Sequence, residues 1–155
     1  MFREMRRIGN ATSEEAAVEI LKNNTNGVLA VHGDDGYPYA VPLSYAYQEG
    51  KIYFHGAVEG YKLESIKKNE KVSFCVVGAD EIIPEEFNTL FKSVIVFGKA
   101  KVLDRAEEKQ RALEAIIDKY SQNFKESGRA YIEKEWDRCV AIELTIEHMT
   151  GKAGD

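Results

Sequence analysis

The sequence contains few of the residues that bind metals or form disulfides. Its 155 residues include two cysteines, three histidines and three prolines. The cysteines and histidines show no CxxC, HExxH or comparable spacing, so we expect no metal site. Cys75 and Cys139 lie in separate apolar stretches, where we expect two buried, reduced thiols rather than a redox pair.

Long apolar runs are also missing. The longest are four-residue pieces such as residues 28–31 and 94–97, whereas a membrane-spanning helix needs about 20 residues. Residues 1–7 are charged and no apolar stretch follows them, so no secretory signal is expected. We therefore expect a cytoplasmic protein without a membrane span.

The chain has no excess of positive charge and none of the common nucleotide or hydrolase motifs. Lys and Arg number 21 and Asp and Glu 26, for a net charge of −5, which argues against nucleic acid as a partner. The absence of GxGxxG, GxxxxGK[ST] and GxSxG removes the support for nicotinamide-binding, P-loop and serine hydrolase classes.

The hydrophobic pattern predicts one mainly β domain spanning residues 1–155. A length of 155 residues suits one domain by the usual prior of roughly 100–200 residues. Thr12 with Glu15, and Asp104 with Glu107, have capping-box spacing and predict helix starts, the second helix ending near Tyr120. A third helix is expected from Tyr61 to about Asn69, and a helical turn near Trp136 after a polar connection.

Five or six mostly antiparallel strands are expected between these helices, as in a barrel with peripheral helices. The predicted strands are residues 28–32, 37–47, 51–55, 71–77, 91–103 and 138–149, with residues 78–88 as a loop. The strand at 91–103 has the strongest β pattern and is expected to be central. The strand at 138–149 alternates apolar with polar residues, which predicts one wet face.

Two prolines lie in one predicted strand. Pro38 and Pro42 cannot donate to a ladder, so this strand should lie at a sheet edge or leave its amide side free for a ligand. The aromatic residues around it are expected to fill the core and a subunit interface.

The segment after the next strand has the character of an anion site. Gly56 and Gly60 bracket a strand-to-helix turn, and the helix N-terminus offers free N–H groups to a phosphate. Lys62 in the first helical turn opposes the helix dipole unless an anion binds there. The alternative is that Lys62, Lys67, Lys68 and Lys71 form a solvated face.

The order of five segments resembles the FMN-binding split-barrel family typified by pyridoxamine phosphate oxidase, in its nitroimidazole-resistance branch. The segments are residues 36–45 (GYPYAVPLSY), 52–57 (IYFHGA) with Gly60 and Lys62-Leu63, 69–74 (NEKVSF), 93–100 (SVIVFGKA) and 150–153 (TGKA). This resemblance implies a mostly antiparallel, Greek-key-like split β-barrel, a homodimer, and FMN in the groove between subunits.

The resemblance also implies the site residues. The cofactor-binding residues would be Ala40, Val41, Pro42, Leu43, His55, Gly56, Ala57, Lys62, Ser93 and Val94. The strand at 40–43 would line the isoalloxazine ring, and residues near Lys62 would surround the phosphate. Thr150, Gly151 and Lys152 match the family's tail, and His55 is the expected catalytic residue, nearest the reacting ligand.

The implied activity is reduction of nitroimidazole or related nitroaromatic compounds by the flavin. A basic pocket for a second phosphate is not evident in the C-terminal strand, so pyridoxamine phosphate is not the expected substrate. The alternative from a different class is a non-catalytic flavin- or haem-binding protein for storage or sensing. A third possibility is a split barrel without a cofactor.

Overall fold

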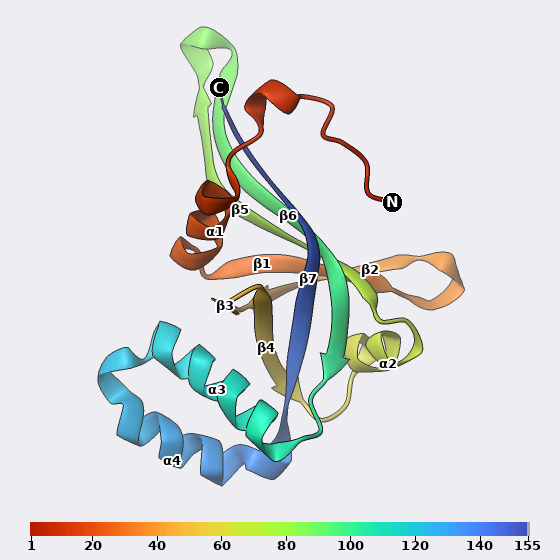
Figure 1. Ribbon diagram of the computed structural model, residues 1–155, viewed down its shortest axis with the longest axis vertical. Helices are drawn as coiled ribbons and strands as arrows, with labels where there is room; N and C mark the ends of the chain where they lie inside the picture. Colours follow the sequence, from red (N-terminus) through yellow and green to blue (C-terminus); the bar gives the residue numbers. More distant parts are fainter. Residues whose placement is uncertain (155) are drawn as a thin grey trace.

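Seven strands form one antiparallel sheet in the order β2-β1-β5-β6-β7-β4-β3. The computed structural model describes residues 1–154, and Figure 1 shows the sheet with helices at its periphery. The strands are β1 (Asn26–His32), β2 (Pro38–Ser44), β3 (Ala46–Gln48), β4 (Lys51–Ala57), β5 (Lys71–Ile83), β6 (Asn88–Val102) and β7 (Cys139–Gly154). The helices are α1 (Glu14–Asn23), α2 (Tyr61–Lys68), α3 (Ala106–Tyr120) and α4 (Lys125–Glu135). The mainly β fold and the central position of β6 are confirmed.

The sheet closes on itself at Tyr45. Strands β2 and β3 lie at opposite ends of the sheet order, yet only Tyr45 separates them in sequence. The predicted single strand at 37–47 is therefore two strands, which raises the count from the expected five or six to seven. Because the chain joins the two edges directly, the sheet must curve until they meet, which is the architecture of a split barrel.

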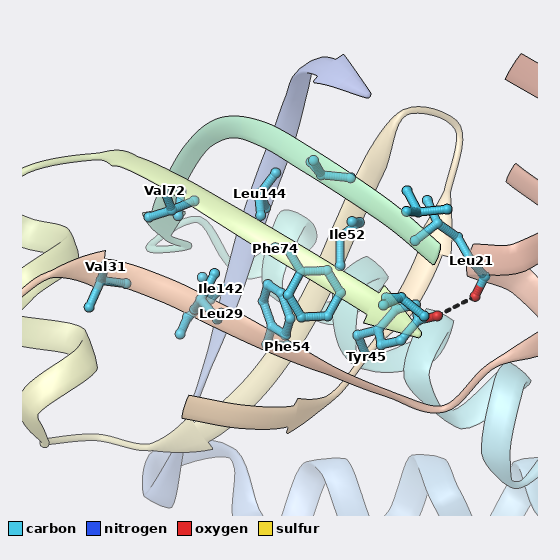
Figure 2. Packing of buried hydrophobic residues seen from close by; sticks show 14 of the residues in the cluster. Leu21, Leu29, Val31, Tyr45, Ile52, Phe54, Val72, Phe74, Ile142 and Leu144 are labelled. Atoms are coloured by element: carbon cyan, nitrogen blue, oxygen red, sulfur yellow. Dashed lines mark hydrogen bonds between the residues drawn. The ribbon is translucent and has the colours of Figure 1, made fainter. Parts of the chain in front are cut away.

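The inside of this curved sheet holds the main core. Tyr45, Phe54 and Phe74 are fully buried, and the rings of Tyr45 and Phe54 each lie 5.1 Å edge-on from Phe74 (Figure 2). The Tyr45 hydroxyl donates to the Leu21 carbonyl at 2.6 Å, drawn as the dashed line. Helix α1 is thereby fixed to the point where the barrel closes.

Lys119 reinforces the same point from α3. Its Nζ lies 3.9 Å from the centre of the Tyr45 ring and donates to the Asn24 carbonyl. Burial lowers the pKa of Lys119 to about 8. The neighbouring Tyr120 hydroxyl accepts from the Tyr45 N–H at 3.1 Å and donates to the Tyr45 carbonyl at 2.6 Å. The backbone at Tyr45 is therefore satisfied by side chains where the ladder is interrupted.

The two prolines lie on an edge strand, as expected. Strand β2 pairs only with β1 and ends the sheet. The Gly33 N–H donates to the Tyr37 carbonyl at 2.8 Å, and hydrogen-bonded pairs alternate along an antiparallel ladder. The pairs His32–Pro38 and Val28–Pro42 are therefore non-hydrogen-bonded ones. Both proline nitrogens face the free edge, where no ladder donor is required.

Both predicted capping boxes are wrong. Helix α1 is capped by Ser13, whose Oγ accepts from the Ala16 N–H at 3.1 Å, and not by Thr12. The Thr12 hydroxyl instead donates to the Ser13 carbonyl. Helix α3 begins after Arg105, and no side chain caps it. In both cases the helix starts one residue later than the motif predicted.

The assignment of the cap to Ser13 predicts a loss of stability on its removal. Ser13→Ala should lower the free energy of unfolding by about 1 kcal/mol, the usual value for an N-cap hydroxyl. Urea unfolding followed by circular dichroism measures this. Ser127→Ala, on the exposed surface of α4, is the control and should change stability little. Equal effects of the two substitutions would contradict the cap.

The predicted loop at 78–88 is wrong, because most of it belongs to a long hairpin. Strands β5 and β6 continue past a bulge between Val77 and Ala79 and pair as far as Ile83 and Asn88. We call residues 78–92 the hairpin arm; it projects beyond the barrel at the top of Figure 1. Much of the arm is exposed, so its sequence lacks the alternation that marks a half-buried strand.

Helix α4 and the second face of β7 also differ from expectation. The predicted polar connection before Arg129 is largely α4. The outward face of β7 is dry at Ala141 and Glu143 because α3 packs over it. The Glu143 carboxylate is buried but lies 3.3 Å from Lys51 Nζ and 3.9 Å from Lys101 Nζ. The two lysines therefore stabilise the Glu143 carboxylate, where the sequence pattern predicted contact with solvent.

Two smaller expectations concern cysteines and membrane helices. Cys75 and Cys139 form no disulfide, and both are half-buried rather than buried. Within residues 1–154, no helix has both the length and the apolar character required to cross a membrane.

Candidate functional site

The end of β4 and the start of α2 form a small cradle around Gly56. A Cβ atom built on Gly56 would lie 3.1 Å from Lys62 Nζ, with no other atom but Lys62 Cε within 4 Å. The space over the Gly56 backbone is therefore open except for the ammonium group. Glycine at this position leaves the backbone accessible beside Lys62, whereas a larger side chain would occupy the space next to the ammonium group.

The N-terminus of α2 supplies further donors to this cradle. Gly60, with φ of 150°, precedes the helix and provides no side-chain cap. The first N–H groups of a helix have no intrahelical partner, and in α2 no capping side chain accepts a hydrogen bond from them. Together with Lys62 they form a positive site that suits a phosphate group.

His55 lies on the other face of β4 from Gly56. Its side chain is exposed on the side toward α3, and its backbone pairs with Ala141. Surrounding protein atoms, and then the charge of Lys62, lower the pKa of the imidazole below its ordinary value. The imidazole is therefore neutral near pH 7, with one ring nitrogen to donate a hydrogen bond and one to accept.

This lowered pKa predicts a pH dependence of stability. The unfolded chain protonates His55 near pH 6.5, the ordinary value, whereas the folded protein does so only at lower pH. The unfolded state therefore binds more protons below pH 6.5, and stability should fall as the pH is lowered from there. Urea midpoints from pH 7.5 to 5 should decline more steeply for the wild type than for His55→Gln. Parallel profiles would show that His55 is unperturbed.

The edge strand β2 is held against α2 by two tyrosines. The Tyr39 and Tyr61 rings stack with centroids 4.5 Å apart, and the Tyr61 hydroxyl accepts from the Asp34 N–H at 2.6 Å. Ala40 and Pro42 are exposed, whereas Val41 and Leu43 pack against the core. Residues 40–43 continue the edge strand directly after the contact between Tyr39 and α2, and the backbone groups of Ala40 and Pro42 face the free edge.

Ser93 and Val94 lie elsewhere on the barrel. They pair with Lys152 and Gly151 of β7, and the Val94 side chain is fully buried in the core. Val102 of β6 lies beside Ile142, near the end of β4. It is eight residues further along β6 than Val94, which is about 26 Å of strand. The structure therefore brings together His55, Gly56, Ala57 and Lys62, and separately Ser93 and Val94 with the tail at Thr150.

Sequence reasoning missed a cavity beside the cradle. It has a volume of about 440 Å³ and lies where β4 ends under α3 and α4. Its walls comprise His55, Gly56, Ala57, Leu113, Ile116, Ile117, Tyr131, Ile132, Glu135, Arg138 and Cys139. The helical periodicity of Leu113, Ile116 and Ile117 indicated a buried face but not that a space remains beneath it. Residues 1–154 contain no cluster of three or more metal-ligating side chains.

The sequence profile of the pyridoxamine 5′-phosphate oxidase family matches residues 13–153. The chain belongs to this family. The match includes every strand of the barrel and the whole cradle at Gly56. No sequence match is found among proteins with curated functions.

Solved structures of family-like proteins superpose over most of the chain. A provisionally assigned 5-nitroimidazole antibiotic resistance protein of Bacteroides thetaiotaomicron has 20% identity and a TM-score of 0.77, covering 92% of this chain and 85% of that one. The flavocytochrome Anf3 of Azotobacter vinelandii has 20% identity and a TM-score of 0.84, covering 98% and 72%. An FAD-binding protein of Mesorhizobium loti has 26% identity and a TM-score of 0.62, covering 94% and 97%. The split-barrel fold is thus shared with proteins of differing descriptions.

Proposed function

We propose that this protein binds a flavin through its phosphate and uses it to reduce nitroimidazole or related nitroaromatic compounds. The observation that carries the proposal is the open cradle over Gly56, closed on one side by Lys62 Nζ. A flavin phosphate placed there would meet a lysine ammonium and uncapped helix N–H groups. Family membership and the flavin-binding descriptions of similar structures support the same ligand.

The residues around the cradle suit a flavin mononucleotide, FMN. Lys62, Gly56 and Ala57 would hold the phosphate, with the neutral His55 nearby. The edge strand at Ala40, Val41, Pro42 and Leu43 would line the isoalloxazine ring, with the backbone groups of Ala40 and Pro42 facing the free edge. When bound, the flavin supplies hydride or single-electron transfer. The chain positions its ring and phosphate, and His55 can hold or donate a hydrogen bond at the reacting ligand.

We further propose that the protein acts as a homodimer in the cytoplasm. The outer sheet face formed by Val28, Cys75, Val77, Ile95 and Phe97 is largely exposed within residues 1–154, although Phe2 stacks on Phe97 at 5.4 Å. Exposed apolar patches of this kind commonly mark protein interfaces. Ser93 and the tail at Thr150 lie beside this face, so a partner subunit could carry them to the flavin groove.

Charge complementarity supports the same arrangement. The hairpin arm carries Asp80, Glu81, Glu85 and Glu86, and its tip residue Phe87 is 97% exposed. Lys67, Lys68 and Lys71 form an exposed basic surface at the end of α2. Opposite charges on two surfaces of one chain favour pairing between copies.

The dimer proposal predicts a loss of assembly when charge is placed on the outer sheet face. Ile95→Glu is exposed in the single chain, so the monomer should still fold while like charges oppose each other across the interface. Sedimentation equilibrium should show a dimer for the wild type and a monomer for this variant. Tyr37→Glu, at an exposed turn residue away from the face, is the control. A monomeric wild type would contradict the proposal.

The function is tested by the chromophore and then by turnover. Protein purified without added cofactor should show a flavin spectrum, and mass spectrometry of the released chromophore should identify it. The reduced protein should reduce metronidazole faster than free FMN at equal concentration. A haem Soret band would instead favour a haem-binding protein, and a flavin without turnover above the free cofactor would favour storage or sensing.

A further inference from the structure

A cavity of about 440 Å³ lies under α3 and α4, and we call it the α3–α4 cavity. The His55 side chain lies on this side of β4, because alternate residues of a strand point to opposite faces and Gly56 faces Lys62. The volume falls within the roughly 300–1,000 Å³ that is typical of small-molecule sites. The Lys62 ammonium belongs to the opposite face of the strand, so the ligand of this cavity is set by the cavity's own walls.

Fixed contacts hold in place the two helices that cover the cavity. Gly128 of α4 packs so closely on α3 that a Cβ atom built on it would lie 2.7 Å from Ile117 Cγ2. Beyond the other end of α4, Lys109 Nζ of α3 donates to the Trp136 and Cys139 carbonyls at 2.7 and 2.8 Å. Ile117 and Cys139 both line the cavity. The space is therefore preformed, as ligand pockets commonly are.

The interior of the cavity is aliphatic. Four branched side chains line it, two of them buried and two half-buried: Leu113, Ile132, Ile116 and Ile117. Tyr131, which is 63% exposed, adds an aromatic ring to the wall. Covering such a surface with apolar groups removes it from water and is favourable in proportion to the area covered. The cavity therefore suits a ligand with an apolar body.

Two side chains of opposite charge line the same cavity. Glu135 is half-buried and Arg138 is exposed. Within residues 1–154, neither forms an ion pair. The Glu135 carboxylate can accept hydrogen bonds from a cation, and the planar Arg138 guanidinium can donate two parallel hydrogen bonds to a carboxylate. The cavity therefore offers one partner for a positive group and one for a negative group.

We propose that the α3–α4 cavity binds a free α-amino acid with an apolar side chain. The ligand carboxylate would pair with Arg138, its ammonium group would pair with Glu135, and its side chain would fill the aliphatic interior. A ligand with a single charge would satisfy only one of the two residues and would place its charge near the other, which carries the same sign. A zwitterion with an apolar side chain complements all three features. This site is separate from the proposed flavin site.

Titration of the isotope-labelled full chain with L-leucine and three analogues, followed by NMR, tests the proposal. We expect L-leucine to bind with a Kd below about 1 mM. Isopentylamine lacks the carboxylate, N-acetyl-L-leucine lacks the ammonium group, and glycine lacks the apolar side chain. Each should bind at least about tenfold more weakly, because each loses one of the three contacts. A weaker Kd for L-leucine, or a smaller difference for any analogue, would overturn the proposal.

Two charge-removing variants assign each end of the ligand to its residue. Arg138→Gln should weaken L-leucine binding about fivefold or more and leave isopentylamine binding unchanged within about twofold, because that analogue has no carboxylate. Glu135→Gln should likewise weaken L-leucine binding but not N-acetyl-L-leucine binding. A merely structural role of either residue would weaken all ligands alike. Equal losses across the ligands, or no loss for L-leucine, would overturn the proposal.

Matched controls and FMN separate this site from general charge and from the flavin. Arg111→Gln and Glu133→Gln change exposed residues of α3 and α4 outside the cavity and should alter L-leucine binding less than about twofold. Saturation with FMN should also leave L-leucine binding unchanged, because Lys62 lies on the other face of β4. Displacement of L-leucine by FMN would place the flavin in the cavity and overturn the proposal. Failure of FMN to bind, with L-leucine binding intact, would overturn only the proposed flavin site.

Discussion

Lys62→Gln is expected to lower flavin affinity by about 10- to 150-fold. A hydrogen bond to a charged group contributes about 1.5–3 kcal/mol, and each 1.4 kcal/mol is a factor of ten in affinity. Among residues 1–154, and apart from the neighbours of Gly56 in the chain, only Lys62 has atoms within 4 Å of a Cβ built on Gly56. No other cation at that position can replace its interaction with the phosphate. Titration of the apoprotein with FMN, followed by flavin fluorescence, measures the loss.

Variants on the same helix separate this specific contact from general charge. Lys67→Gln lies on the exposed surface of α2 and should change flavin affinity less than about twofold, because exposed charges are screened by solvent and salt. Lys62→Arg keeps the charge and should bind with intermediate affinity. A loss below about threefold for Lys62→Gln, or equal losses for Lys62→Gln and Lys67→Gln, would place the phosphate elsewhere.

Tyr45→Ala is expected to lower the free energy of unfolding by about 3–5 kcal/mol, the usual cost of removing a large buried aromatic side chain. Tyr45 is fully buried, its ring meets Phe74 edge-on, and its hydroxyl donates to the Leu21 carbonyl. The substitution also removes the ring under Lys119 at the point where the sheet closes. Chemical unfolding monitored by circular dichroism gives the difference.

Two further tyrosine variants show which part of Tyr45 matters. Tyr45→Phe keeps the ring but leaves the Leu21 carbonyl without its donor, which should cost about 1–3 kcal/mol. Tyr37→Ala, at a side chain 74% exposed, should have an effect within about 0.5 kcal/mol. If Tyr45→Ala were no more harmful than Tyr37→Ala, barrel closure would not depend on the Tyr45 ring.

The candidate site depends on the same closure. Tyr45 connects the end of β2 to the start of β3, and β3 leads directly to β4, where Gly56 is the second-last residue. The stacked Tyr39 and Tyr61 rings link the far end of β2 to α2. The free edge of β2 and the cradle at Gly56 are therefore held in one frame, which is what a ligand with a flat ring and a phosphate requires.

The sequence by itself determined the features that depend on local chemistry. Alternating apolar residues specified the β character and the central position of β6, because burial of one strand face imposes a period of two. Pro38 and Pro42 specified an edge strand, since proline cannot donate to a ladder. Gly56, Gly60 and Lys62 predict an anion site from local sequence alone, because a turn and the first residues of a helix lie within one short segment.

Only the tertiary structure decided features that depend on contacts between distant segments. The division of residues 37–47 at Tyr45 follows from barrel closure, and the buried Glu143 follows from the packing of α3 over β7. The hairpin arm has no local pattern because its strands project beyond the barrel. The cavity beside Gly56 exists because α3, α4 and β4 meet without filling the space between them. Residues as far apart as His55 and Arg138 line it together, and no spacing along the chain could have shown that they do.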